Sequence, residues 1–380
     1  MTRVLYLAVS GERVGGAEAQ YEYLLEDLDR TRFAPLLLTP SRGGFSERVA
    51  RGGIATQVFA YPPWRRRTWL TRRGARARLV AVAREQAIAL VHADFNLGPY
   101  AVAIAAALDV PAVLHVRRPL QPAWIARYGL RRASAVIAIG RRYARQLCAG
   151  GVAAERIAII EDATDAARFA PRGDAPLRRE WPALAGRVLC GLVGRIEPFK
   201  RQLDFLRASA PVVRAGHPLA CVVAGAPNRD WPRYVRNVHA WPNRYGAGVP
   251  VVFTGARTDI EAVIGSLDVL VTLSGGSVML EAMASGVPVI TATDSRPADL
   301  AMVRDGEAGL VVPADDAGAL SAALARLCDD APLRRALGAR GRAHAVQRYS
   351  RARLARDTER LYDAVMHGDR TPATIAPATG

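Results

Sequence analysis

Residues 191–202, GLVGRIEPFKRQ, contain the side chains of this sequence whose types and spacing point most directly to chemistry. Arg195 and Lys200 lie five positions apart, and Lys200 is the only lysine among the 52 Lys and Arg residues. An arginine grips two phosphate oxygens with a planar fork, whereas a lysine ammonium is a compact point charge that fits a crowded pyrophosphate. We therefore predict a diphosphate-binding pair. The alternative is that a single lysine survives by chance in an arginine-rich chain.

A second stretch, VTLSGGSVMLEAMASGVPVITA at 271–292, has the pattern of a strand, a glycine-rich turn, a helix and a strand. Beyond Gly276 in the turn, the helix start would direct unpaired backbone N–H groups toward an anion. Glu281, one turn into the helix, could accept hydrogen bonds from two vicinal hydroxyls of a ribose, or it could be a solvated surface residue. The residues at the helix start are Ser277, Val278 and Met279.

A third candidate is the Gly15–Gly16 pair, which follows the first apolar run and opens a helical pattern. Glycines let a backbone approach a ligand closely, and the free N–H groups of a helix start attract anions. The pattern is not G-x-G-x-x-G, so it gives little support to a dinucleotide cofactor. A simple turn is the alternative.

The elements that must position these residues alternate throughout the chain. Short apolar runs are followed by longer helical patterns, which is typical of parallel sheets covered by helices. Seven strands are predicted before residue 165 and six after residue 187, each series forming one doubly wound sheet. Between them, residues 165–187 are rich in Pro, Gly and charge and form the candidate linker. The predicted fold class is α/β, with two Rossmann-like domains facing each other across a ligand-binding cleft.

Composition agrees with two globular domains. The chain has 380 residues, 50% of them hydrophobic and 23% charged, enough to bury large cores. The first apolar run is too short for a secretion signal, and no run approaches the roughly 18 apolar residues of a membrane span. The four cysteines show no metal-like spacing, so we expect reduced core residues of a cytoplasmic protein.

The net charge of +17 is concentrated in the first half, most densely at 61–78, YPPWRRRTWLTRRGARAR. A basic face with tryptophans fits an anionic membrane surface or an acidic acceptor. An arginine-rich solvated face is the alternative. No RNP aromatics, GXXG loop or zinc spacing is present, so nucleic acid is not an expected partner.

Several motifs in order give the chain a family resemblance. GRIEPFK at 194–200, FTG at 253–255, LEAMASGVPVI at 280–290 and VRDGEAGLVVPADDAGAL at 303–320 resemble the retaining glycosyltransferases of the GT-B fold, specifically family four. Upstream, GGAE at 15–18, LVHADFNLG at 90–98 and IIEDATDAARF at 159–169 are also similar. The resemblance covers residues 3 to about 367.

The resemblance implies roles for domains and residues. Residues 1–170 would form the acceptor domain and 188–350 the nucleotide-sugar donor domain, with 351–367 a helix returning to the first domain. The tail, 368–380, is expected to be disordered because it has few bulky apolar residues. The same resemblance implies that Arg195 and Lys200 bind the diphosphate, that Glu281 binds the ribose and that Arg257 contacts the base. Gly16, next to Gly15, would lie against the donor phosphate or sugar.

Three departures from the family pattern bear on the sugar. Leu273 replaces a second glutamate that commonly reads hydroxyls of the transferred sugar, and Asp94 stands where the family often repeats His. The family's active-site histidine falls on Arg117, while His115 lies two residues earlier on the same strand face. We predict that either residue meets the donor sugar. A merely packed strand histidine is the alternative for His115.

The resulting expectation is a cytoplasmic, retaining hexosyltransferase-type enzyme (EC 2.4) that moves a sugar from a nucleotide donor to a hydroxyl of a glycan or lipid-linked acceptor. Cell-surface polysaccharide, lipopolysaccharide or glycolipid synthesis would be its setting, with a peripheral position at the inner face of the cell membrane. No cofactor or metal is expected, because two cations and a helix dipole already neutralise the leaving diphosphate. The alternatives are a sugar-nucleotide epimerase and a degenerate, non-catalytic sugar-nucleotide- or glycan-binding protein.

Overall fold

The computed structural model describes the chain apart from residues 13–14, 65–67, 247, 294–301 and 370–380. The chain divides into two compact units. The N-terminal unit comprises residues 1–163 and the chain from Arg351 onward, and the C-terminal unit comprises Thr164–Ser350. Most of the tail predicted to be disordered lies outside the described residues.

The N-terminal unit contains one parallel sheet of seven strands, as predicted, and their order is β3-β2-β1-β4-β5-β6-β7. The central strands are apolar runs because helices cover both faces of such a sheet. The strands are β1 (Thr2–Leu7), β2 (Phe33–Thr39), β3 (Ala55–Val58), β4 (Leu90–Asp94), β5 (Ala112–Val116), β6 (Ala135–Ala138) and β7 (Ile157–Ile159). The helices are α1 (Gly16–Asp27), α2 (Gly44–Arg51), α3 (Trp69–Glu85), η2 (Phe95–Leu97), α4 (Gly98–Leu108), α5 (Pro122–Arg127), η3 (Leu130–Arg132), α6 (Arg141–Ala149), η4 (Ala154–Arg156) and α14 (Arg351–Met366).

The C-terminal unit contains a parallel sheet of six strands in the order β10-β9-β8-β11-β12-β13, which confirms the second predicted series. The strands are β8 (Val188–Val193), β9 (Leu219–Ala224), β10 (Val251–Gly255), β11 (Val269–Thr272), β12 (Val289–Ala292) and β13 (Gly309–Val312). The helices are α7 (Pro176–Glu180), η5 (Pro182–Leu184), η6 (Pro198–Lys200), α8 (Gln202–Arg214), α9 (Pro232–Arg244), α10 (Ile260–Gly265), α11 (Val278–Ala284), α12 (Ala317–Asp329) and α13 (Ala331–Arg348).

Both sheets reverse their strand order beside their first strand. The reversal falls between β1 and β4 in the N-terminal unit and between β8 and β11 in the C-terminal unit. The loops leaving the carboxyl ends of such neighbouring strands diverge to opposite faces, so each reversal opens a crevice where ligands of doubly wound sheets bind. The candidate residues after β8 and β11 therefore meet at one edge.

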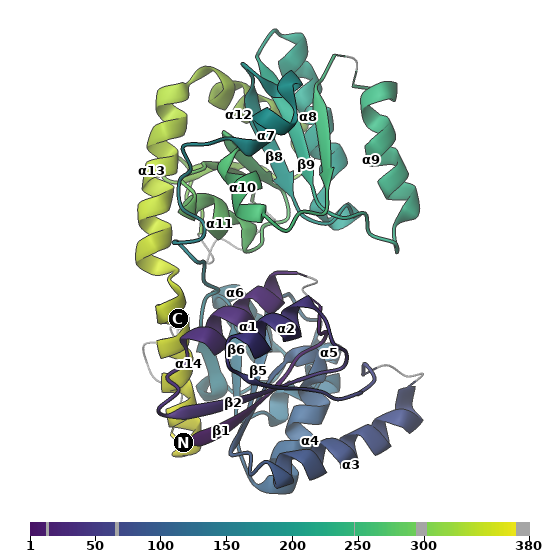
Figure 1. The fold of residues 1–380 in the computed structure, drawn as a ribbon, viewed down its shortest axis with the longest axis vertical. Coiled ribbons are helices and arrows are strands. Elements are labelled where there is room, and N and C mark those ends of the chain that lie inside the picture. The colour runs from purple at the N-terminus through teal and green to yellow at the C-terminus, as the bar shows by residue number, and fades with distance from the viewer. Residues whose placement is uncertain (13–14, 65–67, 247, 294–301, 370–380) are drawn as a thin grey trace. The chain divides into compact units, whose positions relative to one another are not determined.

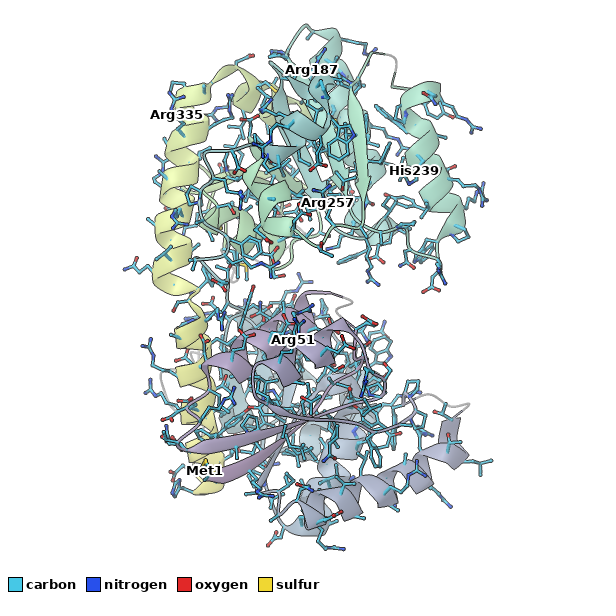
Figure 2. The ribbon with its side chains drawn as sticks, in the orientation of Figure 1. Met1, Arg51, Arg187, His239, Arg257 and Arg335 are labelled. Atoms are coloured by element: carbon cyan, nitrogen blue, oxygen red, sulfur yellow. The ribbon has the colours of Figure 1, made fainter. Side chains whose placement is uncertain are left out.

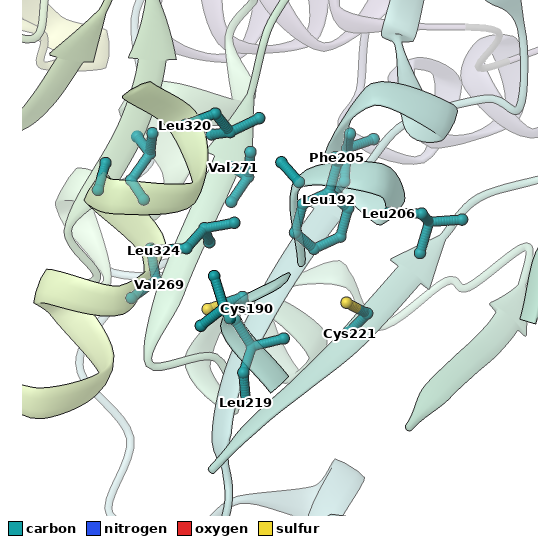
Figure 3. Close-up of a cluster of buried hydrophobic side chains, with 14 of the residues drawn as sticks. Cys190, Leu192, Phe205, Leu206, Leu219, Cys221, Val269, Val271, Leu320 and Leu324 are labelled. Carbon is teal, nitrogen blue, oxygen red and sulfur yellow. The ribbon is translucent and has the colours of Figure 1, made fainter. Parts of the chain in front are cut away.

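The core of the C-terminal unit contains three of the four cysteines. Figure 3 shows Cys190 on β8 and Cys221 on β9, which are paired in the strand register, among Leu, Val and Phe side chains. All four cysteines are free thiols. The expectation that all are core residues is wrong for Cys148, which is exposed on the amphipathic helix α6.

The last helix of the described chain belongs to the N-terminal unit. α14 packs beside α1 (Figure 1), and Leu354, Leu361 and Tyr362 are fully or almost fully buried in the core of that unit. The ring of Tyr362 meets Phe33 edge-on at 5.6 Å between centroids. Arg32 pairs with Asp363 at 2.7 Å beside this contact.

Two segments differ from what their composition predicts. The candidate linker at 165–187 contains α7 and η5, and it packs into the C-terminal unit because Phe169, Leu177 and Leu184 are buried there. The stretch around Trp231 and Trp241 contains two prolines and still forms α9. Pro232 occupies the first turn, where a missing N–H costs little, and Pro242 lies within the last turn.

Candidate functional site

A short loop after β8 holds both predicted diphosphate ligands. This segment, residues 194–201, is called the cation loop below. It is tied to the loop after β9 by a backbone hydrogen bond from Ile196 N–H to Ala226 O at 2.9 Å. Gly194 begins it with φ +153°, a conformation that favours glycine. The backbone of the cation loop is therefore fixed before any ligand arrives.

The backbone of Arg195 is hydrogen-bonded, whereas its side chain is half-exposed. Its carbonyl accepts from Gln202 Nε2 at 2.8 Å, and its guanidinium makes a long 3.4 Å contact with Glu197, leaving the side chain 49% exposed. The other carboxylate oxygen of Glu197 accepts from Asn228 Nδ2 at 2.6 Å. Asn228 and Glu197 thus form a clamp that sequence reasoning did not identify, because its two members lie on different loops.

Lys200 extends along the glycines of two different turns. A Cβ placed on Gly194 would lie 3.2 Å from the Lys200 Cε, and one placed on Gly276 would lie 3.8 Å from its Nζ. Gly276 has φ +116°, which L side chains rarely adopt. The ammonium therefore lies beside the turn after β11, and neither Gly194 nor Gly276 has a side chain to separate it from the backbone. The structure brings together Arg195, Lys200 and Gly276 at the β8–β11 reversal.

The helix start after this turn is only partly open. Thr272 Oγ1 donates to Gly275 O at 3.1 Å and fixes the turn before Ser277. The Met279 N–H donates to Gly276 O at 3.1 Å, so the expectation of an unpaired N–H at Met279 is wrong. Tightening of the first turn of α11 explains this bond. The buried side chains of Val278 and Met279 anchor the seven-residue helix in the core.

Glu281 lies in the first turn of α11 and is half-buried. Its backbone carbonyl accepts from the Ser285 N–H and from Ser285 Oγ, both at 3.0 Å. The ribose contact of Glu281 stays a prediction.

Arg257 is already held by two carboxylates. Its guanidinium donates to both oxygens of Glu180, at 2.8 and 2.9 Å, and to both oxygens of Asp259, at 2.8 and 2.7 Å. Arg257, labelled in Figure 2, therefore ties α7 to the start of α10. A nucleotide contact stays a prediction, and it would have to draw on a guanidinium with two existing partners. Asp259 uses its carboxylate for this pair rather than to cap α10.

The Gly15–Gly16 pair is exposed at the start of α1, at the β1–β4 reversal of the N-terminal unit. Gly15 has φ −169°, extended backbone that any residue adopts, and its N–H donates to Glu18 Oε2 at 2.9 Å. One N–H expected to be open to an anion is therefore already used within α1. Burial raises the pKa of Glu18.

His115, within β5, and Arg117, directly after it, form one hydrogen-bonded group. Arg117 donates to the Nδ1 of His115 at 3.1 Å and to Asp162 Oδ1 at 3.2 Å. His115 is 1% exposed, and burial together with the Arg117 charge lowers its pKa well below the ordinary value, so the imidazole is neutral. Within the described residues, the buried His115 Nε2 and Arg117 Nη1 have no hydrogen-bond partner.

Behind this group runs a column of buried rings. His92 stacks on His115 at 5.8 Å between centroids and on Tyr6 at 5.3 Å. Tyr362 contacts the Nδ1 of His92 and, at 2.9 Å, the Oη of Tyr6. Burial lowers the pKa of His92 to about 3. Asp94 is also buried, which raises the pKa of its carboxyl. No signal in the sequence could pair His92 with Tyr362, 270 residues away.

Leu273, where the family often has glutamate, is 4% exposed. It lines a cavity of about 230 Å³ with Ala292, Val312 and Leu320 on one side and Arg201 on the other. Arg201 itself is paired with Asp204 and Asp315.

The part of the chain that the structure describes lacks two further features. There, no three His, Cys, Asp or Glu side chains are grouped so that they could hold a metal ion. None of the helices described has both the length and the apolar character that crossing a bilayer requires.

Comparison with known proteins identifies the family. Residues 187–330 match the family described as Glycosyl transferases group 1, and residues 14–168 match Glycosyltransferase Family 4. Together the two matches span most of the chain. The chain belongs to this family of glycosyltransferases, which are enzymes of class EC 2.4, and its two doubly wound sheets are those of the GT-B fold.

The individual relatives are distant. The chain is 29% identical over 231 residues to D-inositol 3-phosphate glycosyltransferase of Nocardia farcinica, a match that covers 58% of this chain and 51% of the relative. It is 26% identical over 242 residues to the lipopolysaccharide core biosynthesis mannosyltransferase LpsB of Rhizobium meliloti, covering 62% and 67%. Except for LpsB, the chain spans only about half the length of these first curated relatives.

Among solved structures, Anabaena Alr3699/HepE in complex with UDP and glucose superposes with a TM-score of 0.81 at 21% identity, covering 94% of this chain and 98% of that one. Sucrose-phosphate synthase of Thermosynechococcus elongatus gives a TM-score of 0.80 at 19% identity, covering 97% and 100%. These likenesses establish the fold.

Proposed function

We propose that this protein is a retaining glycosyltransferase that moves a sugar from a nucleoside diphosphate donor to a hydroxyl of a glycan or lipid-linked acceptor. Cell-surface polysaccharide or glycolipid synthesis is the proposed setting, supported by relatives named for lipopolysaccharide core synthesis. The reaction is placed in the cytoplasm, and four free thiols agree with a reducing compartment.

The observation that carries this proposal is the position of Lys200. Its ammonium lies beside the Gly276 turn, and it shares the cation loop with the half-exposed Arg195. Two positive groups and a backbone that lacks side chains at both glycines suit a diphosphate, which needs charge and close approach together. The half-buried Glu281 on α11 supports a ribose position one helical turn further on.

In the proposed reaction the acceptor hydroxyl attacks the anomeric carbon from the face that the diphosphate leaves. The bond from the anomeric carbon to the phosphate oxygen breaks through an oxocarbenium-like state, and that oxygen takes the hydroxyl proton. Arg195 and Lys200 stabilise the charge that develops on the leaving group, which is the main electrostatic contribution such a site can make. These two cations support a reaction that proceeds without a metal ion.

The N-terminal unit is proposed to contact the sugar through Arg117 and His115. Buried polar atoms in proteins are nearly always hydrogen-bonded. The buried, unpartnered His115 Nε2 and Arg117 Nη1 therefore support a role toward sugar hydroxyls. Because His115 is neutral, it would act as a hydrogen-bonding group and not as a charge.

The test is thermal stabilisation of the full chain by UDP, GDP, ADP and CMP, since a ligand that binds only the folded state raises Tm according to its affinity. One diphosphate should raise the Tm of the wild type and of Arg214→Gln, which removes a charge from the exposed end of α8. It should raise the Tm of Lys200→Gln much less. If no nucleotide stabilises the wild type at millimolar concentration, the donor site is not functional and the proposal fails.

Turnover then separates the enzyme from its alternatives. Release of the diphosphate that depends on an added glycan or lipid acceptor supports transfer. An isomerised donor formed without acceptor would instead identify an epimerase, and binding without turnover across acceptor panels would identify a binding protein.

A further inference from the structure

A groove on the N-terminal unit is not used by the proposed reaction. A cavity of about 730 Å³ lies among α3, α4, α5 and η3, within the size range of small-molecule sites. Figure 1 shows α3 and α4 side by side, on the far side of this unit from α14. This cavity is called the α3–α4 groove. The apolar side chains of Val80, Val102, Ala103 and Ala106 line it and are together called its apolar floor.

The rim of the α3–α4 groove has positive charge without counter-charge. Arg76 on α3, Arg127 on α5 and Arg132 on η3 line it, and all three are exposed. Among the described residues no carboxylate pairs with any of them, and no acidic residue lines the groove. Elsewhere in this unit arginines do pair with carboxylates, as Arg48 does with Glu22 at 2.6 Å. Three like charges around one depression repel each other and favour an anion.

Trp64 also lines the groove and contacts two neighbouring side chains. Its ring meets Tyr100 edge-on at 5.2 Å, and the Arg72 guanidinium lies 4.2 Å from its centroid. Tyr100 is itself held by a hydrogen bond from its hydroxyl to Pro62 O at 2.8 Å. Tryptophan so placed is typical of the boundary between water and the hydrocarbon of a bilayer.

The combination of an apolar floor and a cationic rim selects an amphiphile. A free phosphate or a nucleic acid would satisfy the arginines but would leave the Val and Ala floor exposed to water. An acyl chain next to a phosphate satisfies both. We propose that the α3–α4 groove binds an anionic phospholipid, with a chain on its floor and the phosphate at the arginines, and so docks the N-terminal unit on an anionic membrane. The inference rests on the proposed function in one respect: docking on the membrane would bring the protein to a lipid-linked acceptor.

The test is co-sedimentation of the full chain with vesicles of phosphatidylcholine alone and of phosphatidylcholine containing about one third phosphatidylglycerol. The wild type should bind the anionic vesicles and not the neutral ones. Each arginine near an anionic surface contributes about five-fold to binding. The double variant Arg76→Glu/Arg127→Glu should therefore bind at least about 20-fold more weakly. Equal binding to both vesicles would overturn the proposal.

A matched control separates the groove from net charge. Arg356→Glu/Arg360→Glu removes the same charge from exposed positions of α14, in the same unit. It should bind anionic vesicles within about two-fold of the wild type. If it loses binding as the groove variant does, the contact is a diffuse effect of the +17 charge and the groove has no specific role.

The apolar floor is tested separately with Ala106→Phe, which fills the groove from an exposed position on α4 and leaves every charge in place. Vesicle binding should fall at least about five-fold, and glycerol phosphate, which lacks acyl chains, should not compete with vesicles for the wild type. Undiminished binding by Ala106→Phe, together with full displacement of vesicles by RNA, would show a polyanion surface and overturn the lipid assignment.

The same variants keep this inference distinct from the proposed function. Stabilisation by the diphosphate that the wild type binds should be unchanged in the groove variants, which also reports that they fold. Loss of vesicle binding with intact nucleotide binding supports the groove. A protein that binds anionic vesicles through the groove but no nucleotide refutes the proposed transfer and leaves the docking inference standing.

Discussion

The two units use positive charge in opposite ways. In the C-terminal unit, Arg195 is half-exposed on a backbone framed by glycines, next to Lys200 in the same loop. In the N-terminal unit, the Arg117 side chain is 11% exposed and is bound to Asp162 and His115. An exposed cation retains its charge for an anion that arrives and leaves. A buried, paired cation has lost most of that capacity and serves instead to fix the direction of its neighbours.

This contrast assigns different chemistry to the two units. The cation loop is suited to neutralising a mobile leaving group, because Arg195 is half-exposed and its contact with Glu197, at 3.4 Å, is long. The Arg117 group is suited to holding a neutral substrate, because its net charge is compensated by Asp162 and its imidazole is uncharged. The following variants test each side of this comparison.

The largest effect is expected at Lys200. Lys200→Gln should lower kcat by about 10²–10³-fold, the usual loss when one group that stabilises transition-state charge is removed. Lys200→Arg should restore only part of it, since the Gly194 and Gly276 turns leave little room for a planar fork. Release of nucleoside diphosphate in the presence of acceptor measures both. Full activity of Lys200→Gln would remove the cation loop from the mechanism.

Breaking the buried pair of the N-terminal unit should act on stability instead. Asp162→Asn leaves the Arg117 charge uncompensated, and the loss of one member of a buried pair costs about 3–5 kcal/mol. Urea unfolding measures this loss. Asp363→Asn, which breaks the exposed pair with Arg32, should cost less than about 1 kcal/mol. Equal costs would mean that the two pairs do not differ as their burial indicates.

The buried imidazoles predict how stability varies with pH. His92 has a pKa of about 3 in the folded chain and about 6.5 when unfolded, so below pH 6.5 the unfolded state binds the additional proton. The free energy of unfolding should therefore fall as the pH is lowered below 6.5. At pH 5 this group alone should lower it by about 2 kcal/mol relative to neutral pH. In His92→Gln, which keeps an acceptor for Tyr362, the dependence should be shallower by that amount. An unchanged slope would show that His92 titrates normally.

The smallest effect is expected from the clamp behind Arg195. Asn228→Ala removes the hydrogen bond to Glu197, which is worth about 1 kcal/mol, and leaves Arg195 less well oriented. Diphosphate affinity should fall about three- to five-fold with little change in Tm. Asn243→Ala, at an exposed position on α9, is the control. A loss equal to that of Lys200→Gln would mean that Asn228 contacts the ligand itself.

Whether a feature could be predicted from the sequence depended on how far apart in the chain the interacting residues lie. Both sheets were predicted because each strand is a local apolar run, and strands that alternate with helical patterns are typical of a parallel sheet. The order of the strands within each sheet was not predicted, because it depends on contacts between distant segments. The pairing of Lys200 with the Gly276 turn could also be predicted, since each loop directly follows a strand beside the reversal. The role of Tyr362 could not be predicted, because its partner His92 lies 270 positions away.

The contacts that could not be predicted have the same origin. The base contact of Arg257 stays a prediction, but its pairing with Glu180 could not be predicted, because Glu180 belongs to a segment expected to be a linker, 77 positions away. The segment at 165–187 contains prolines and charges, yet Phe169 and Leu177 are enough to bury it in the C-terminal unit. The first turn of α11 is tightened, so that the Met279 N–H donates a hydrogen bond to Gly276 O. The amino-acid composition does not predict this local geometry.

Because α14 completes the N-terminal unit, the order of synthesis and the order of folding differ. The strands of this unit leave the ribosome before the C-terminal unit, but their core lacks Leu354, Leu361 and Tyr362 until α14 has been made. The C-terminal unit is one continuous stretch, Thr164–Ser350, and can fold before α14 is made. Throughout that interval α14 does not yet cover the apolar face of the N-terminal unit, and Tyr6 and His92 lack their partner Tyr362. A nascent chain with such an exposed apolar face is a natural substrate for chaperones that protect growing chains.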